Sequence, residues 1–291
     1  MTNGGLQYQY ARLSITEKLI AINVAIYIID GLLIFLLGLP KNFVSGWFDL
    51  PVDLMNFIGQ PWSLVTYSFF HDNFWHLFWN MVMLYFSGRI FLNLFSARKF
   101  INVYFLGVIL GGLLFMISYN IFPVFLGTKT SLIGASAGVT AVLIFICSYI
   151  PNQEVRVFFF NVKLWYIGAF FVLVDLLQIP AGNAGGRIAH LGGALLGYMY
   201  ARQLTKGVDI GAGFSKRLDS LWALIKPGTK KAPMKTVYKK PGKGKKSKVD
   251  YDKENRQRKI DSILDKISKS GYESLSKAEK DFLFKAGKDT K

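Results

Sequence analysis

Cysteine and histidine are scarce in this sequence. The 291 residues contain a single cysteine, Cys147, inside an apolar run, so an intramolecular disulfide is excluded and the redox compartment is not constrained. The three histidines, His71, His76 and His190, all belong to the apolar part of the chain. Ionisable groups in such surroundings are costly and usually functional, so these histidines are candidates for a site.

Charged residues are scarce before residue 206. Residues 1–205 carry 11 Lys and Arg against 7 Asp and Glu, a net charge of +4, whereas residues 206–291 carry 24 against 11, a net charge of +13. An apolar block followed by a basic polar block indicates a membrane domain followed by a tail in water.

Six apolar segments have about the 20 residues that a helix needs to cross a bilayer. The first lacks an A-x-A cleavage site, so we interpret it as a membrane helix and expect no cleavable signal peptide. The connection over 40–74 is rich in Trp, Phe, Leu and Pro, which predicts short amphipathic pieces at the outer membrane surface. The sequence thus predicts an all-α, polytopic six-helix bundle. The segments are residues 19–39, 75–95, 100–121, 134–150, 163–179 and 187–205.

Lys and Arg concentrate on the cytoplasmic side of membrane proteins. With six spans, the N-terminus, the connections after the second and fourth helices, and the basic tail all fall on one side. We therefore expect both termini to be cytoplasmic. The opposite connections carry only Lys41, Lys129 and Arg187.

This orientation places four polar side chains in one layer of the bilayer. His76 and Asn80 lie near the start of the second helix and share one face because they are four residues apart. Ser136 begins the fourth helix, and His190 lies near the start of the sixth. All three helices run from outside to inside, so the sequence predicts a site in the outer part of the membrane.

Small residues surround two of these side chains. Gly134 and Gly138 flank Ser136, and Gly193 and Gly197 follow His190 at a four-residue spacing. Such spacing lets helix backbones approach closely, so we expect the fourth and sixth helices to pack against each other.

A histidine base beside a serine makes the hydroxyl a usable nucleophile. Ser136 and His190 are the candidates for these roles. Asp175 and Asp30 lie in apolar helices, but neither belongs to a motif, so no acidic residue presents itself as a third member.

Three motifs occur together in the order HDNFWHLFWN, GASAG and AHLGG. Over about residues 15–205 they make the chain resemble the rhomboid family of intramembrane serine proteases. The resemblance implies a catalytic dyad of Ser136 and His190, an oxyanion site that includes His76 and Asn80, and a structural role for His71. It also implies that no cofactor and no metal take part.

Two positions depart from the pattern of that family. Ala137 follows the serine where many members have glycine, and its methyl group could crowd the oxyanion site. Trp47 is followed by Phe48 where many members have arginine, so the first outer loop is expected to be braced differently.

The resemblance implies an endopeptidase in a bacterial inner membrane that cleaves single-span or polytopic membrane proteins near the outer face. Substrate helices would enter beside the fifth helix. A catalytically silent relative that binds membrane proteins as a chaperone is the alternative. Such proteins typically lack the catalytic serine or histidine, whereas this chain has both Ser136 and His190. A transporter would need repeated halves with broken helices, and the sequence has no such repeat.

The tail is predicted in two parts after the membrane domain of residues 1–205. Residues 206–252 form a basic, flexible linker with a Lys/Pro/Gly run, and residues 253–291 form a short helical hairpin in which Ser276 and Glu279 make a capping box. The lysines either are simply solvated or attract anionic lipid. Nucleic acid is not expected as a partner, because aromatic residues are few in the run.

Overall fold

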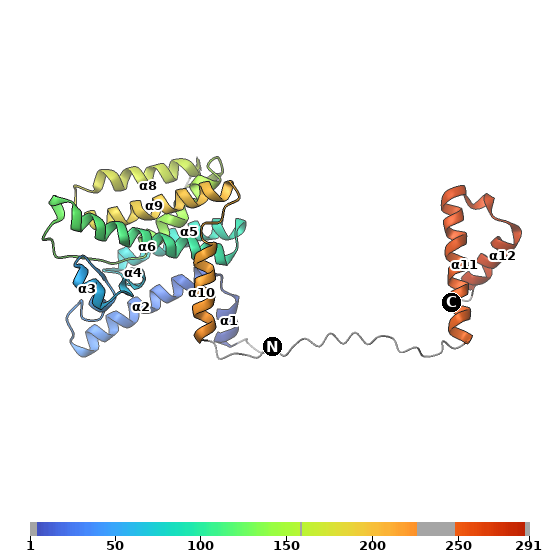
Figure 1. Ribbon diagram of the computed structural model, residues 1–291, viewed down its shortest axis with the longest axis horizontal. Coiled ribbons are helices and arrows are strands. Elements are labelled where there is room, and N and C mark those ends of the chain that lie inside the picture. Colours follow the sequence, from blue (N-terminus) through green and yellow to red (C-terminus); the bar gives the residue numbers. More distant parts are fainter. Residues whose placement is uncertain (1–4, 158, 226–247, 289–291) are drawn as a thin grey trace. The chain divides into compact units, whose positions relative to one another are not determined.

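The computed structural model describes residues 5–157, 159–225 and 248–288 (Figure 1). The chain divides into a larger unit, Met1–Gly228, and a smaller unit, Thr229–Lys291, which are described separately. Both units are mainly helical, but the all-α prediction is wrong in detail, because the larger unit also contains two small two-stranded sheets.

Six helices of the larger unit match the predicted apolar segments to within four residues at each end. Two of them, α2 and α6, are long and apolar enough to cross a membrane by length and composition, while α7 and α8 are shorter apolar helices. The six predicted helices are therefore confirmed as helices, whereas six membrane crossings remain a prediction. Their bounds are α2 (Ile15–Leu37), α5 (Phe74–Leu94), α6 (Ala97–Ile121), α7 (Ser136–Tyr149), α8 (Leu164–Gln178) and α9 (Ala184–Thr205).

Local sequence determines where several of these helices begin. Ser14 caps α2 in a capping box with Glu17, and Asn73 caps α5 by accepting a hydrogen bond from the backbone N–H of His76 at 2.9 Å. Asn183 caps α9 from a left-handed conformation with φ of 50°. Because Asn73 and Asn183 set the first turns of α5 and α9, they also set the heights of His76 and His190.

α7 lies at the centre of the bundle, where α6 and α9 pack on it through glycines. A Cβ atom built at Gly193 of α9 would lie 2.0 Å from the Ala137 carbonyl oxygen, and one at Gly197 would lie 2.2 Å from the Ala141 carbonyl oxygen. Neither site has room for a methyl group. The predicted close packing of the fourth and sixth predicted helices, α7 and α9, is therefore confirmed. α9 also packs against α6 and α8, and Figure 1 shows it running beside each of them.

The connection over residues 40–74 consists of short pieces, as predicted. One strand, β1 (Leu50–Pro51), pairs antiparallel with β2 (Ser131–Leu132), which leads directly into α7. The other pieces are η1 (Ser45–Trp47), α3 (Leu54–Gly59), α4 (Ser63–Thr66) and η2 (Tyr67–Phe69).

Trp47 and Phe48 of this connection are held without an arginine. The Trp62 indole N–H donates to the Trp47 carbonyl at 2.8 Å, and the Thr66 hydroxyl donates to the Phe48 carbonyl at 2.9 Å. The Phe48 ring stacks on Phe70 with centroids 5.0 Å apart. The expectation of a different bracing therefore has a structural explanation.

Four other elements were not predicted from the sequence. The connection between α7 and α8 forms an antiparallel hairpin of β3 (Glu154–Val157) and β4 (Phe160–Lys163). A helix, α1 (Leu6–Arg12), precedes α2, and a short turn, η3 (Pro123–Phe125), follows α6.

The linker prediction is wrong for part of its length, because α10 (Ala212–Ile225) follows α9. The Asn102 amide of α6 donates to the Gly211 carbonyl at 3.1 Å, and the Ser215 hydroxyl donates to the Asn102 side-chain oxygen at 2.8 Å. Tyr200 also donates to Asp209. These buried bonds fix the start of α10 to the bundle, whereas most of the Lys/Pro/Gly run lies outside the described residues.

The smaller unit is a helical hairpin of α11 (Lys248–Ser270) and α12 (Lys277–Lys288), joined through η4 (Tyr272–Ser274). Ile263 and Leu275 are buried between its parts. The predicted capping box is present, since the Ser276 N–H donates to Glu279 at 2.7 Å and the Glu279 N–H donates to the Ser276 hydroxyl at 3.3 Å. The hairpin starts five residues earlier than predicted.

Candidate active site

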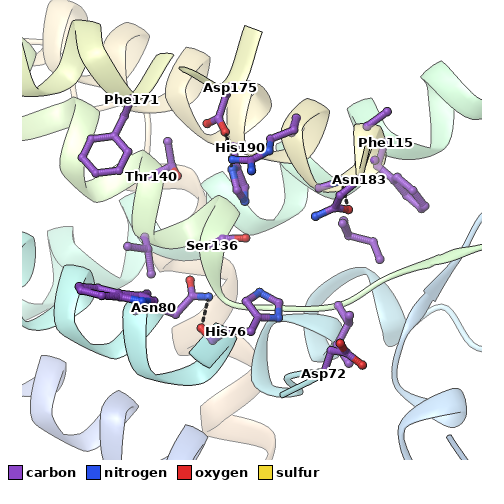
Figure 2. A pocket seen from close by; sticks show the side chains of 18 of the residues that line it. Asp72, His76, Asn80, Phe115, Ser136, Thr140, Phe171, Asp175, Asn183 and His190 are labelled. Carbon is purple, nitrogen blue, oxygen red and sulfur yellow. Dashed lines mark hydrogen bonds and ion pairs between the residues drawn. The ribbon is translucent and has the colours of Figure 1, made fainter. Parts of the chain in front are cut away.

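A cavity of about 1020 Å³ opens among α5, α7, α8 and α9. Ser136, His190, His76 and Asn80 all line it, although they come from three helices. Figure 2 shows Ser136 between His190 on one side and His76 with Asn80 on the other. The structure therefore brings together the four side chains that the sequence placed at one depth.

Ser136 is the first residue of α7, so its backbone N–H lies at an open helix N-terminus. The preceding turn depends on Gly134, which has a φ of 118° and donates its N–H to the Tyr67 carbonyl at 2.9 Å. Ser136 and His190 face the same cavity, and the structure has no direct hydrogen bond between them. Catalytic hydrogen bonds are often long or poorly aligned in the absence of substrate. The lack of a Ser136–His190 hydrogen bond is therefore compatible with a nucleophile and its base.

Asp175 of α8 contacts the imidazole of His190, which the sequence prediction missed. One carboxylate oxygen, Oδ1, lies 3.0 Å from His190 Nδ1 and accepts a 2.8 Å hydrogen bond from Arg187. The resemblance drawn from the sequence implies a dyad without an acidic third member, and this carboxylate beside the base was not foreseen. The available signal was that Asp175 is the only acidic residue between Glu154 and Asp209.

His76 and Asn80 occupy successive turns at the start of α5. The Asn80 amide donates to the His76 carbonyl at 2.9 Å, which leaves one of its two N–H groups unused. The His76 ring lies against the turn that holds Ser136, because a Cβ atom at Gly134 would be 2.6 Å from its Cε1 and Nε2 atoms. Both side chains are thus within reach of the space beside Ser136.

His71 does not line the cavity and instead supports the turn before Ser136. Its Nε2 atom accepts a long hydrogen bond of 3.5 Å from the Ala135 N–H, and its ring meets His76 edge-on with centroids 5.1 Å apart. Burial lowers the pKa of His71 to about 3, so the ring is neutral and can accept this bond. These contacts fit the expected structural role.

The methyl group of Ala137 does not crowd the cavity. Ala137 is 1% exposed and packs against α6, where a Cβ atom at Gly111 would lie 2.7 Å from the Ala137 Cβ. Gly138 faces α6 as well, because a Cβ atom there would lie 2.8 Å from the Tyr104 ring. The crowding expected from the sequence is avoided because α6 has a glycine opposite the extra methyl group.

Asp72, which lines the cavity, forms an ion pair with Lys41, whose Nζ atom lies 2.9 Å from Asp72 Oδ1. This hydrogen bond lowers the pKa of Asp72 and keeps it ionised. Across the described ranges, no group of three or more His, Cys, Asp or Glu side chains is placed to hold a metal ion.

The rhomboid domain family matches residues 58–207, which include all of these cavity residues. The chain belongs to the rhomboid family. Residues 246–285, which cover most of the helical hairpin, match DUF6576, a family of unknown function. Rhomboid proteins are membrane proteins and generally intramembrane serine proteases, so family membership agrees with the apolar bundle.

Curated relatives from three organisms match parts of the chain. Rhomboid-like protein 12, mitochondrial, of Arabidopsis thaliana is 28% identical over 54% of this chain and 50% of its own length. Rhomboid protein 1, mitochondrial, of Saccharomyces cerevisiae is 28% identical over 67% and 55%, respectively. Presenilin-associated rhomboid-like protein, mitochondrial, of Rattus norvegicus is 26% identical over 48% and 37%. The chain thus spans about half the length of the first two, and their mitochondrial names do not support the bacterial membrane expected from the sequence.

Proposed function

We propose that this rhomboid protein is an intramembrane serine endopeptidase that uses Ser136 as nucleophile and His190 as base. The observation that carries the proposal is the convergence of Ser136, His190, His76 and Asn80 on one cavity from three helices. A membrane chaperone would need a surface for its client, but it would not need this combination of side chains.

In the proposed reaction, Ser136 Oγ attacks the carbonyl carbon of a peptide bond while His190 takes the hydroxyl proton. His190 then gives that proton to the leaving amine, and an acyl-enzyme remains on Ser136. A water molecule, activated by the same imidazole, hydrolyses the ester and restores the serine.

The tetrahedral intermediates carry a negatively charged oxygen that needs hydrogen-bond donors. The Ser136 N–H at the start of α7, the free N–H of the Asn80 amide and the His76 ring are the proposed donors. Losing one such donor typically raises the barrier by about 2.7–4 kcal/mol, so each is expected to matter for rate more than for binding.

The substrates are proposed to be membrane proteins with a transmembrane segment. Trp75 and Trp79 of α5 and Phe170 and Phe171 of α8 all line the cavity, so its sides suit an apolar chain. α8 is covered little by the bundle, since Leu164, Gly168 and Asp175 are its buried residues. We further propose that the substrate helix enters beside α8. Gly, Ala or Ser residues near the cleaved bond would be preferred, because they weaken the substrate helix.

The proposal also retains the predicted topology, with both termini cytoplasmic and the cavity open to the outer side. Attraction of the Lys/Pro/Gly run to anionic lipid stays a prediction.

A cleavable transmembrane reporter in membranes or proteoliposomes tests the function. Ser136→Ala and His190→Ala are each expected to abolish cleavage without reducing expression. The control variant Ser220→Ala, on the exposed face of α10, is expected to retain cleavage. A fluorophosphonate probe should label the wild type and fail on Ser136→Ala. Substrate capture with neither cleavage nor labelling by the folded wild type would instead establish the chaperone alternative.

A further inference from the structure

Asp175 is exceptional within its helix. α8 exposes Phe170, Leu173 and Leu177, while Asp175 turns inward and is 4% exposed as a residue. Burying an ionised group costs free energy unless it is paired and hydrogen-bonded, so its partners indicate why it is retained there.

The partners of Asp175 both belong to α9 and are three residues apart. Arg187 and His190 meet the same oxygen, Oδ1, at 2.8 Å and 3.0 Å. Figure 2 shows the carboxylate directed at the His190 ring from the side away from His76. Since Nδ1 is the nitrogen that faces Asp175, Nε2 is the nitrogen left for Ser136.

An ion pair with Arg187 alone would be enough to fasten α8 to α9. It would not require a carboxylate within hydrogen-bond distance of the base. A neutral imidazole carries its proton on only one nitrogen, and a carboxylate at Nδ1 selects the form with that nitrogen protonated. Nε2 then has its lone pair free to accept the Ser136 proton.

We propose that Asp175 is a positioning residue for catalysis, which holds His190 in the productive tautomer and stabilises its protonated form, with Arg187 holding the carboxylate in place. The inference rests on the proposed protease function. It replaces the expected dyad with three linked residues on α7, α8 and α9.

Proton movement under this proposal is balanced without protonating Asp175. The Ser136 proton passes to Nε2, giving an imidazolium whose Nδ1–H still donates to the carboxylate, and then passes to the leaving amine. The charged or titratable groups around the ring are Asp175 from α8, Arg187 from α9 and His76 from α5, and Ser136 faces it from α7. Asp175 supplies the negative charge among them.

The test is Asp175→Asn in the full chain, measured by reporter cleavage from about pH 5 to 9. Because an amide can donate to Nδ1 and favour the wrong tautomer, kcat is expected to fall about 100-fold to 10,000-fold while KM changes little. The acidic limb of the pH–rate profile should also move to lower pH, because the amide stabilises the imidazolium less than a carboxylate. Fastening of the helices alone would not move that limb.

The matched control is Asp53→Asn, which removes a carboxylate that caps α3, a role that asparagine fills equally well. It should leave kcat and the pH profile unchanged. Arg187→Gln should lower kcat by less than Asp175→Asn, since the carboxylate keeps its bond to His190.

A kcat for Asp175→Asn within threefold of the wild type, with the same pH profile, overturns the inference. If that variant does not fold, Asp175→Glu replaces it. The glutamate keeps the charge but moves the carboxylate by one methylene, so an unchanged kcat there overturns the inference equally. Cleavage that persists in Ser136→Ala would instead refute the protease proposal itself.

Discussion

The His76 ring lies against the α-carbon of Gly134, two residues before the proposed nucleophile. A methyl group added to Gly134 would be 2.6 Å from the Cε1 and Nε2 atoms of that ring, while φ of 118° already restricts the position to glycine. The turn that presents Ser136 and the proposed oxyanion donor on α5 are thus fitted to each other.

Gly134→Ala should therefore displace His76 and impair catalysis. Losing one oxyanion donor corresponds to about a 100-fold to 1,000-fold drop in kcat, measured on the transmembrane reporter. Gly127→Ala is the control, because Gly127 also has a positive φ, of 79°, but no atom lies within 4 Å of an added Cβ. Equal losses in both variants would assign the effect to backbone strain and contradict the steric explanation.

Gly193→Ala should destabilise the bundle, because the added methyl group would lie 2.0 Å from the Ala137 carbonyl oxygen. Overpacking of this kind costs about 1–3 kcal/mol, which thermal unfolding in detergent should report as a lower Tm. Gly31→Ala in α2 is the control, since its added methyl group meets nothing within 4 Å. A Tm for Gly193→Ala equal to that of the control would show that α7 and α9 are packed more loosely.

Asn102→Ala should release the start of α10. The change leaves the Ser215 hydroxyl and the Gly211 carbonyl without their partner, at a cost of about 1–3 kcal/mol. Hydrogen exchange of the α10 amides should become faster while the exchange of the α7 amides stays slow. Unchanged exchange in α10 would mean that Tyr200 and Asp209 alone hold it.

Asp49, immediately before β1, should make stability depend on pH. Burial raises the pKa of Asp49 to about 7. Between about pH 4 and pH 7 the folded protein therefore binds more protons than the unfolded chain. As a result, the free energy of unfolding falls as the pH rises through this range. Asp49→Asn should remove this contribution, about 1–4 kcal/mol across that range. The measurement is the wild-type minus variant difference in Tm as a function of pH, and a flat difference would contradict it.

The sequence was sufficient to predict which side chains lie together at the candidate site. Apolar lengths gave the six helices, and charge placement put His76, Ser136 and His190 near corresponding helix ends, which the structure joins in one cavity. These features depend on local composition and on order along the chain, so they can be derived before any contact is known.

Features that depend on contacts between distant segments could not be derived in this way. Asp175 is surrounded in the sequence by apolar residues, and its role depends on where α8 faces α9. The harmless methyl group of Ala137 depends on Gly111, 26 positions away, and the start of α10 depends on Asn102. Each of these contacts depends on how a helix is rotated about its axis and where it crosses its neighbour. The spacing of apolar residues along the sequence does not determine either of these.

The shortness of α7 has a consequence for the membrane around the protein. Its 14 residues span about 21 Å at 1.5 Å per residue, against a hydrocarbon thickness of about 30 Å. If the inner end of α7 reaches the inner boundary, Ser136 lies roughly 9 Å below the outer one. Under the proposed topology and protease function, bilayer thickness then sets how far a substrate bond must move into the membrane to be cut, so lipid chain length becomes a variable of the reaction.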